Sequence, residues 1–321
     1  MKQILFLLLP FTAFLSVAEE IKQGQLLHAE QLVNQLNYKV LLQDIAKFEN
    51  QLAKLNSFPA EVIAKSRLLK LLSVEKATED QRAWVASQAK STEQLSLANP
   101  DHPGQYFEIM SIARSAKNTQ FQWLVNQTEE NYSNQWLVHN WQWSLFVINA
   151  TELEYKALSQ AIKTADEPTI HWLQQQLIEQ TLSQVSNRLL ALLLSRKSNL
   201  TLLKQLWKNA SDQYSYQVLQ RLKNALPAEQ AVAHIILAAE NNNLMSQSLM
   251  QLAKDFQHDE IAQQFLLKKL QQPNSAWLAA TALSQTSNAQ LHHDLLKLVK
   301  HSNDGPIRFA TKHISTTEIK E

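Results

Sequence analysis

Apolar residues in the first third of the chain recur at helical spacing. Between positions 29 and 55 they lie mostly three or four residues apart, which predicts one long helix over residues 22–56. Pro59 fits the first position of a second helix, and helical spacing resumes through Leu72. We therefore predict a long N-terminal helical hairpin, followed by a helix whose start is marked by the capping-box residues Thr78 and Gln81.

Leucines in the second half recur about every 30 residues. Leu193, Leu222, Leu252 and Leu283 lie 29, 30 and 31 positions apart. A second apolar series keeps nearly the same period, and its members are Leu206-Trp207, Ile235-Ile236, Phe265-Leu266 and Leu295-Leu296. Two series that advance together predict a two-helix unit. Because one such unit cannot bury its apolar face alone, we expect neighbouring units to stack.

The least helical stretch is residues 91–104, where two prolines and a glycine fall within five positions. We interpret this stretch as a linker loop between an N-terminal hairpin region, residues 19–90, and a helical-repeat domain, residues 105–321. Within that domain, short breaks coincide with helix-start residues such as Pro168 and Pro227.

One part of the repeat domain resembles a known family. A helix rich in small residues over positions 274–286 is followed by a leucine-rich helix over positions 289–299. This arrangement resembles a HEAT-type repeat, and the resemblance covers about residues 186–314. It implies an all-α fold, a right-handed α-solenoid of stacked antiparallel helical hairpins, with a surface used for recognition.

Glycine content supports the all-α prediction. The chain has only 3 glycines in 321 residues, whereas a sheet protein of this size needs many turns with positive φ. Hydrophobic residues make up 45% of the chain, which indicates a folded protein. The net charge of +1 predicts no general attraction to nucleic acid or to anionic lipid.

The first residues are typical of a secretory signal peptide. A lysine at position 2 precedes an apolar run, and Ser16-Val17-Ala18 places small residues at the −3 and −1 positions of a cleavage site. We predict a signal peptide over residues 1–18, a mature chain that begins at Glu19, and a periplasmic or secreted bacterial protein. The run is shorter than a membrane span requires, and the chain has no cysteine for a lipid anchor or a disulfide.

No motif that carries catalysis is present. With three glycines and no cysteine, the chain has no phosphate-binding loop, no nucleophile elbow and no thiolate, and it has no HExxH motif. The histidines lack the i, i+4 spacing that helical metal sites prefer, so we predict no metal and no cofactor. The one acid–base pair on an expected loop is Asp101-His102, with Tyr106 close by, and it is a candidate loop site.

Aromatic residues concentrate between positions 121 and 146. Trp123, Trp136, Trp141 and Trp143 lie within 21 residues, together with His139. We predict that one helix presents them in two directions, with Trp136 and Trp143 on a shared face and Trp141 on another. One face must then be core, while the other either packs on the next hairpin or lines a groove for a glycan or peptide.

We therefore predict an exported helical-repeat scaffold or adaptor that binds another protein and performs no catalysis. The alternative is a binding module for cell-wall glycan or peptide that uses the tryptophan cluster. An enzyme with an unrecognised site is a third, less favoured reading.

Overall fold

A computed structural model describes residues 18–99, 101–102, 104–180, 185–301 and 305–317. The chain is mostly helical, with 71% helix and 18 helices among the described residues, and this confirms the all-α class. It divides into two compact units, Met1–Glu130 (unit 1) and Asn131–Glu321 (unit 2). The predicted signal peptide lies outside the described residues, apart from Ala18.

Unit 1 contains five helices before the strand at residues 94–98. The prediction of a single long helix over residues 22–56 is wrong. Three helices occupy that range: α1 (Gln23–Val33), α2 (Tyr38–Leu41) and α3 (Ile45–Leu52). The chain turns after α1, and the side chain of Asp44 then caps α3 by accepting a hydrogen bond from the backbone N–H of Lys47 at 2.8 Å. A capping side chain starts a new helix, which apolar spacing alone does not reveal.

The remaining helices of this group are α4 (Phe58–Leu72) and α5 (Glu79–Gln88). Helix α4 has Pro59 in its first turn and packs against α1, so the two parts of the predicted hairpin do contact each other, with α2 and α3 between them in the chain. Thr78 and Gln81 form the predicted capping box of α5.

A three-stranded sheet completes unit 1, which the sequence did not predict. Strand β1 (Ala18–Ile21) pairs in parallel with β2 (Gln94–Ala98), and β2 pairs antiparallel with β3 (Tyr106–Ser111). The expected linker at 91–104 is therefore largely one strand and a hairpin loop. Its Gly104 has φ +86°, which favours glycine. Leu95 and Ile21 bury against the helices, and this burial stabilises the sheet.

Helix α6 (Ile112–Leu137) follows β3, and the division between the two units falls within it, not in the 91–104 stretch. Its first half packs on α4 in unit 1, where the Thr119 hydroxyl donates a hydrogen bond to the Leu69 carbonyl at 2.9 Å. The Trp123 indole N–H likewise donates to the Leu72 carbonyl at 2.7 Å.

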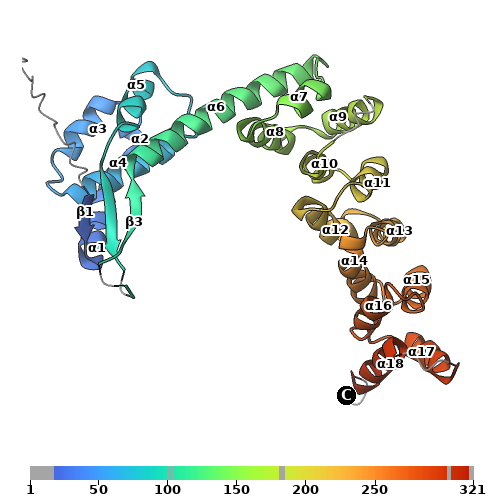
Figure 1. The fold of residues 1–321 in the computed structure, drawn as a ribbon. Coiled ribbons are helices and arrows are strands. Elements are labelled where there is room, and N and C mark those ends of the chain that lie inside the picture. Colours follow the sequence, from blue (N-terminus) through green and yellow to red (C-terminus); the bar gives the residue numbers. More distant parts are fainter. Residues whose placement is uncertain (1–17, 100, 103, 181–184, 302–304, 318–321) are drawn as a thin grey trace, which may run out of the picture. The chain divides into compact units, whose positions relative to one another are not determined.

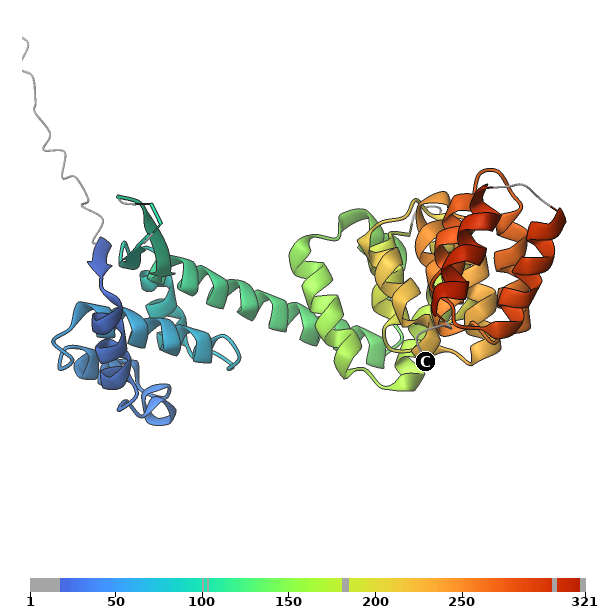
Figure 2. The ribbon, with the colours of Figure 1, turned by 90° about the horizontal axis from the view of Figure 1, so that it is seen from below.

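Unit 2 is built from helical hairpins in two rows (Figures 1 and 2). The short helix α7 (Trp143–Asn149) comes first. The even row consists of α8 (Glu152–Thr164), α10 (Asn187–Leu194), α12 (Gln213–Ala225), α14 (Asn242–Asp255), α16 (Ala276–Leu283) and α18 (Gly305–Thr317). The odd row consists of α9 (Glu167–Glu179), α11 (Leu200–Lys208), α13 (Ala228–Ala238), α15 (Glu260–Leu270) and α17 (Ala289–His301).

Each even-row helix contacts the next one in its row, and α9, α11, α13 and α15 do the same in theirs. The predicted leucine register is confirmed, since Leu222, Leu252 and Leu283 lie on successive even-row helices and are 2%, 0% and 0% exposed. The second apolar series lies on α11, α13, α15 and α17, with one fully buried residue in each pair.

Asparagine side chains connect successive hairpins. Asn241 caps α14 and donates from its amide to the carbonyl of Asn209 at 3.0 Å, in the loop after α11. Near the C-terminal end, the buried Asn288 amide donates to the Gln257 carbonyl and its oxygen accepts from the Leu291 N–H at 3.1 Å. These bonds satisfy loop carbonyls that stacking would otherwise leave without a partner.

Candidate functional site

The tryptophan cluster lies on two helices rather than one. Helix α6 ends at Leu137 and α7 begins at Trp143, and His139 between them adopts φ 52°. The chain reversal brings Trp136, Trp141 and Trp143 together, and they are only 3%, 7% and 0% exposed. Because no single helix carries all three residues, the predicted separation of Trp141 from Trp136 and Trp143 is wrong.

These rings form an aromatic core. The Trp141 ring meets those of Trp136 and Trp143 edge to face, with centroids 5.9 and 5.3 Å apart, and that of Tyr132 at 4.9 Å. The Trp143 indole N–H donates to the Leu173 carbonyl at 2.9 Å and so joins α7 to α9. Edge-to-face contacts of this kind stabilise the start of unit 2 beyond the burial of area.

The binding surface expected from these tryptophans is therefore corrected. Three of its five members, Trp136, Trp141 and Trp143, are core residues whose faces are covered by one another. His139 is exposed and packs its ring against that of Trp172, with centroids 4.7 Å apart. The reversal between α6 and α7 contains neither glycine nor proline, and Asn140 is its only residue of a type that favours turns.

Trp123 belongs to unit 1 and differs from the others. Its ring is half-buried and lines a hollow of about 790 Å³ between α6 and the chain that joins α4 to α5. The apolar lining is Val74, Ala77, Ala86 and Leu124, and the charged lining is Glu75, Lys76, Arg82 and Glu130. The bond to the Leu72 carbonyl holds the indole at the wall of this hollow.

The candidate loop site does not assemble. Asp101 and His102 are exposed in the hairpin loop between β2 and β3, where the Asp101 backbone N–H donates to the Asn99 side chain at 3.0 Å. Tyr106 is exposed on β3. No hydrogen bond joins the carboxylate, imidazole and phenol within the described part of the loop.

A groove that the sequence did not indicate lies on the even row of unit 2. Its volume is about 410 Å³, and its walls are one face of each of three successive helices. The lining residues are Glu152, Tyr155, Lys156, Ser159 and Lys163 of α8, Arg188, Ala191, Leu192 and Ser195 of α10, and Tyr214, Gln217, Val218 and Arg221 of α12. On each helix these positions follow i, i+3, i+4 and i+7, so each contributes a continuous stripe. We call this surface the three-helix groove.

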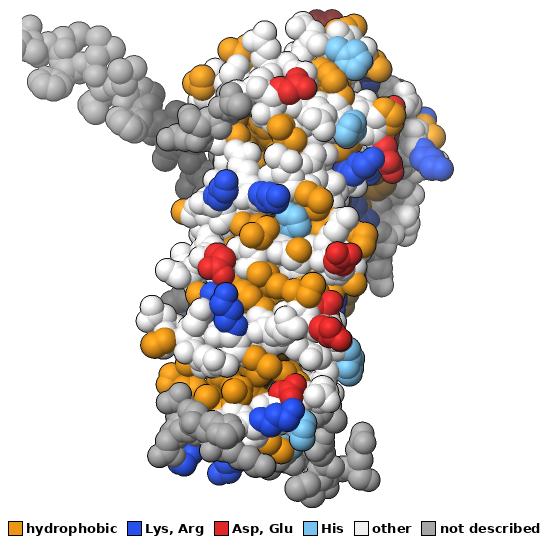
Figure 3. Space-filling model, turned by 90° about the vertical axis from the view of Figure 1, so that its right-hand side faces the viewer, with side chains coloured by type: hydrophobic (Ala, Val, Ile, Leu, Met, Phe, Trp, Pro, Cys, Tyr) orange, Lys and Arg blue, Asp and Glu red, His pale blue; other side chains and the backbone are white. Residues whose placement is uncertain are grey.

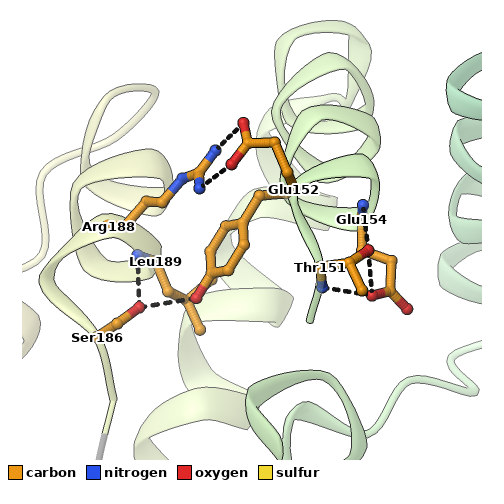
Figure 4. Close-up of polar contacts among 7 residues, drawn as sticks. Thr151, Glu152, Glu154, Ser186, Arg188 and Leu189 are labelled. Carbon is orange, nitrogen blue, oxygen red and sulfur yellow. Dashed lines mark hydrogen bonds and ion pairs between the residues drawn. The ribbon is translucent and has the colours of Figure 1, made fainter. Parts of the chain in front are cut away.

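One end of the three-helix groove is held by a fixed ion pair. Figure 4 shows Arg188 of α10 and Glu152 of α8 facing each other, and the guanidinium donates two hydrogen bonds to the carboxylate at 2.7 and 2.8 Å. The guanidinium also lies over the Tyr155 ring, 4.2 Å from its centroid. The Tyr155 hydroxyl shares a hydrogen bond of 2.9 Å with Ser186, which caps α10.

Protonation of this pair follows from its geometry. The hydrogen bonds from Arg188 lower the pKa of Glu152, and those same bonds raise the pKa of Arg188. Both groups therefore stay charged near neutral pH, and the two parallel hydrogen bonds join α8 to α10 at the edge of the groove.

The groove offers hydrogen-bonding and cationic side chains. The three-helix groove contains hydroxyls, an amide, cations and one engaged carboxylate, but no histidine or cysteine. Across the described ranges of the chain, no three histidine, aspartate or glutamate side chains gather closely enough to hold a metal ion. Nor is any helix in those ranges both long and apolar enough to cross a membrane.

Comparison with known proteins gives no match: no family model, no curated protein and no solved structure is significantly similar to this chain. The site is therefore interpreted from its own geometry.

Proposed function

We propose that this chain is an exported scaffold or adaptor that binds another protein along the even row of unit 2. The observation that carries the proposal is the three-helix groove, a continuous surface made of equivalent stripes from three stacked helices. Extended surfaces of this kind are what stacked hairpins provide, and their common use is recognition.

The same proposal includes an α-solenoid architecture of the HEAT type for unit 2, with right-handed stacking. Its support is the contact of each even-row helix with the next, and the burial of leucines spaced about 30 residues apart. The proposal of a periplasmic or secreted location rests on the signal-like residues 1–18.

Expression of the tagged full-length chain in its native host tests this function. We expect the mature chain to start at Glu19, to fractionate outside the cytoplasm, and to retain one or a few host proteins after crosslinking and quantitative mass spectrometry. An uncleaved chain confined to the cytoplasm would contradict export. A chain that retains nothing above an untagged control would contradict the scaffold role.

A second function, the binding of cell-wall glycan or peptide, has the Trp123 hollow in its favour. Ligands commonly pack on a fixed, half-exposed indole. If this alternative holds, soluble cell-wall fragments change the tryptophan fluorescence of the wild type, and the effect is lost in Trp123→Phe and in Leu124→Gln. A matched change at the exposed Leu145 in unit 2 leaves the response intact.

A further inference from the structure

Charge is unevenly distributed over unit 2. The whole chain has 30 basic and 29 acidic residues, but the three-helix groove is lined by four cations and a single carboxylate. The face made by the odd row has acidic and basic side chains interspersed with apolar ones (Figure 3). The basic excess is thus a local property of the groove.

The cations of the groove differ in how far they are engaged. Arg188 uses both terminal nitrogens on Glu152 and packs on Tyr155, so it is held as part of the wall. Lys163 and Arg221 are exposed on α8 and α12, and no carboxylate within the described part of the chain forms an ion pair with either one. These two cations are therefore available to an external anion.

Two carboxylates at the starts of the groove helices α8 and α12 are already used. The Glu154 carboxylate accepts hydrogen bonds from the backbone N–H and the hydroxyl of Thr151. The Asp212 carboxylate caps α12 by accepting from the N–H groups of Tyr214 and Ser215, each at 3.0 Å. Neither carboxylate can neutralise Lys163 or Arg221 without giving up a helix cap.

We propose that the three-helix groove binds an extended, acidic segment of a partner protein. The inference rests on the proposed scaffold function and names the chemistry of its partner. Lys163 and Arg221 supply the complementary charge, and the Ser159 hydroxyl and the Gln217 amide supply hydrogen-bonding groups for a peptide backbone. The Ser195 hydroxyl donates to the Leu192 carbonyl at 2.6 Å and can accept from a peptide N–H.

The dimensions of the groove favour a short extended peptide. Packed helices lie about 8–10 Å apart, so three helices span about 20 Å between their outer axes. An extended chain advances about 3.3 Å per residue, and about six residues cross this distance. The apolar floor of Ala191, Leu192 and Val218 suits the methylene groups of such a segment.

Other polyanions fit less well. The Tyr155 ring has Arg188 on one face, so that face cannot stack on a sugar or a nucleobase. Nucleic-acid binding also needs many phosphate contacts, and two available cations supply few of them. An acidic oligosaccharide is the competing ligand that the experiment must separate.

Fluorescence anisotropy with the purified full-length chain tests the proposal, using labelled hexaglutamate as the probe. We expect saturable binding that weakens as salt increases, with no binding of labelled hexaglutamine or hexalysine. The double variant Lys163→Gln/Arg221→Gln should weaken hexaglutamate binding at least tenfold. The matched variant Lys204→Gln/Lys208→Gln, which removes two exposed cations from α11, should bind as the wild type does.

Circular dichroism of both variants checks that folding is retained, as expected for exposed positions. Absence of saturable hexaglutamate binding, or an equal loss in the α11 variant, would overturn the inference. Tighter binding of an oligogalacturonate that also depends on Lys163 and Arg221 would overturn it in favour of a glycan. If hexaglutamate fails while the chain still retains a host partner, the scaffold function stands and only the acidic-segment inference is wrong.

Discussion

Trp141 sits at the centre of the aromatic core of unit 2, in contact with four other rings. Its alanine variant should lower the free energy of unfolding by about 3–5 kcal/mol, because a buried indole leaves a large cavity. Leu145→Ala, at an exposed position on neighbouring α7, should change it by less than about 1 kcal/mol. Chemical denaturation monitored by circular dichroism measures both. Unchanged stability for Trp141→Ala would mean that Trp141 is a surface residue.

His234 gives the protein a predictable response to pH. It is 4% exposed on α13, and burial, with a smaller contribution from the charge of Lys204, lowers its pKa below the ordinary value of 6.5. The unfolded chain therefore takes up a proton more readily than the folded chain as the pH falls below about 6.5. The free energy of unfolding should decrease in that range, and it should level off above it.

Unfolding free energies measured between pH 5 and pH 8 for the wild type and His234→Leu isolate this contribution. The decline below about pH 6.5 should be shallower in the variant, because leucine does not titrate. Identical slopes for the two proteins would contradict burial of a neutral imidazole at this position.

At the scale of elements, the repeat register can be tested directly. Leu252 is fully buried on α14, at the position equivalent to Leu222 on α12. Leu252→Ala should lower the free energy of unfolding by about 2–5 kcal/mol, since it removes packing between stacked helices. The matched change Lys254→Ala, at an exposed position of the same helix, should cost less than about 1 kcal/mol. Similar costs for the two would show that α14 does not present its leucines to its neighbours.

The sequence predicted the helices of unit 2 better than those of unit 1. In unit 2, each helix buries one narrow apolar stripe against other helices. The spacing of apolar residues along the chain therefore predicts these helices. In unit 1, the break before α3 depends on Asp44, a single capping residue. The sheet depends on pairing between residues 18–21 and 94–97, which are far apart in sequence. The order of apolar and polar residues within each segment does not indicate such a pairing.

The aromatic core and the three-helix groove were missed for a related reason. Each groove helix has polar side chains along one face, for example Arg188 and Ser195 on α10. In the sequence alone, such a face looks the same as any solvent-exposed helix face. Only stacking places three such stripes side by side and brings the cations of α8 and α12 into one groove. Likewise, the tryptophans come together only because the chain reverses at His139.

At the scale of the whole molecule, the two units have different kinds of surface. The hollow beside Trp123 in unit 1 is lined by two acidic and two basic side chains, whereas the three-helix groove of unit 2 is lined by four cations and one carboxylate. We propose that the partner binds to the three-helix groove of unit 2. Its stripes come from stacked helices with buried leucines, so the groove is formed before a partner arrives.

Site-specific photocrosslinking in the native host shows whether a partner contacts the three-helix groove. A photoreactive amino acid placed at Gln217, which is exposed within the three-helix groove, should give one or a few discrete protein adducts. The same group at Lys208 on α11 should give none, and Lys163→Gln/Arg221→Gln should abolish the adducts from Gln217. Adducts from Lys208 with none from Gln217 would contradict a partner-binding role for the groove.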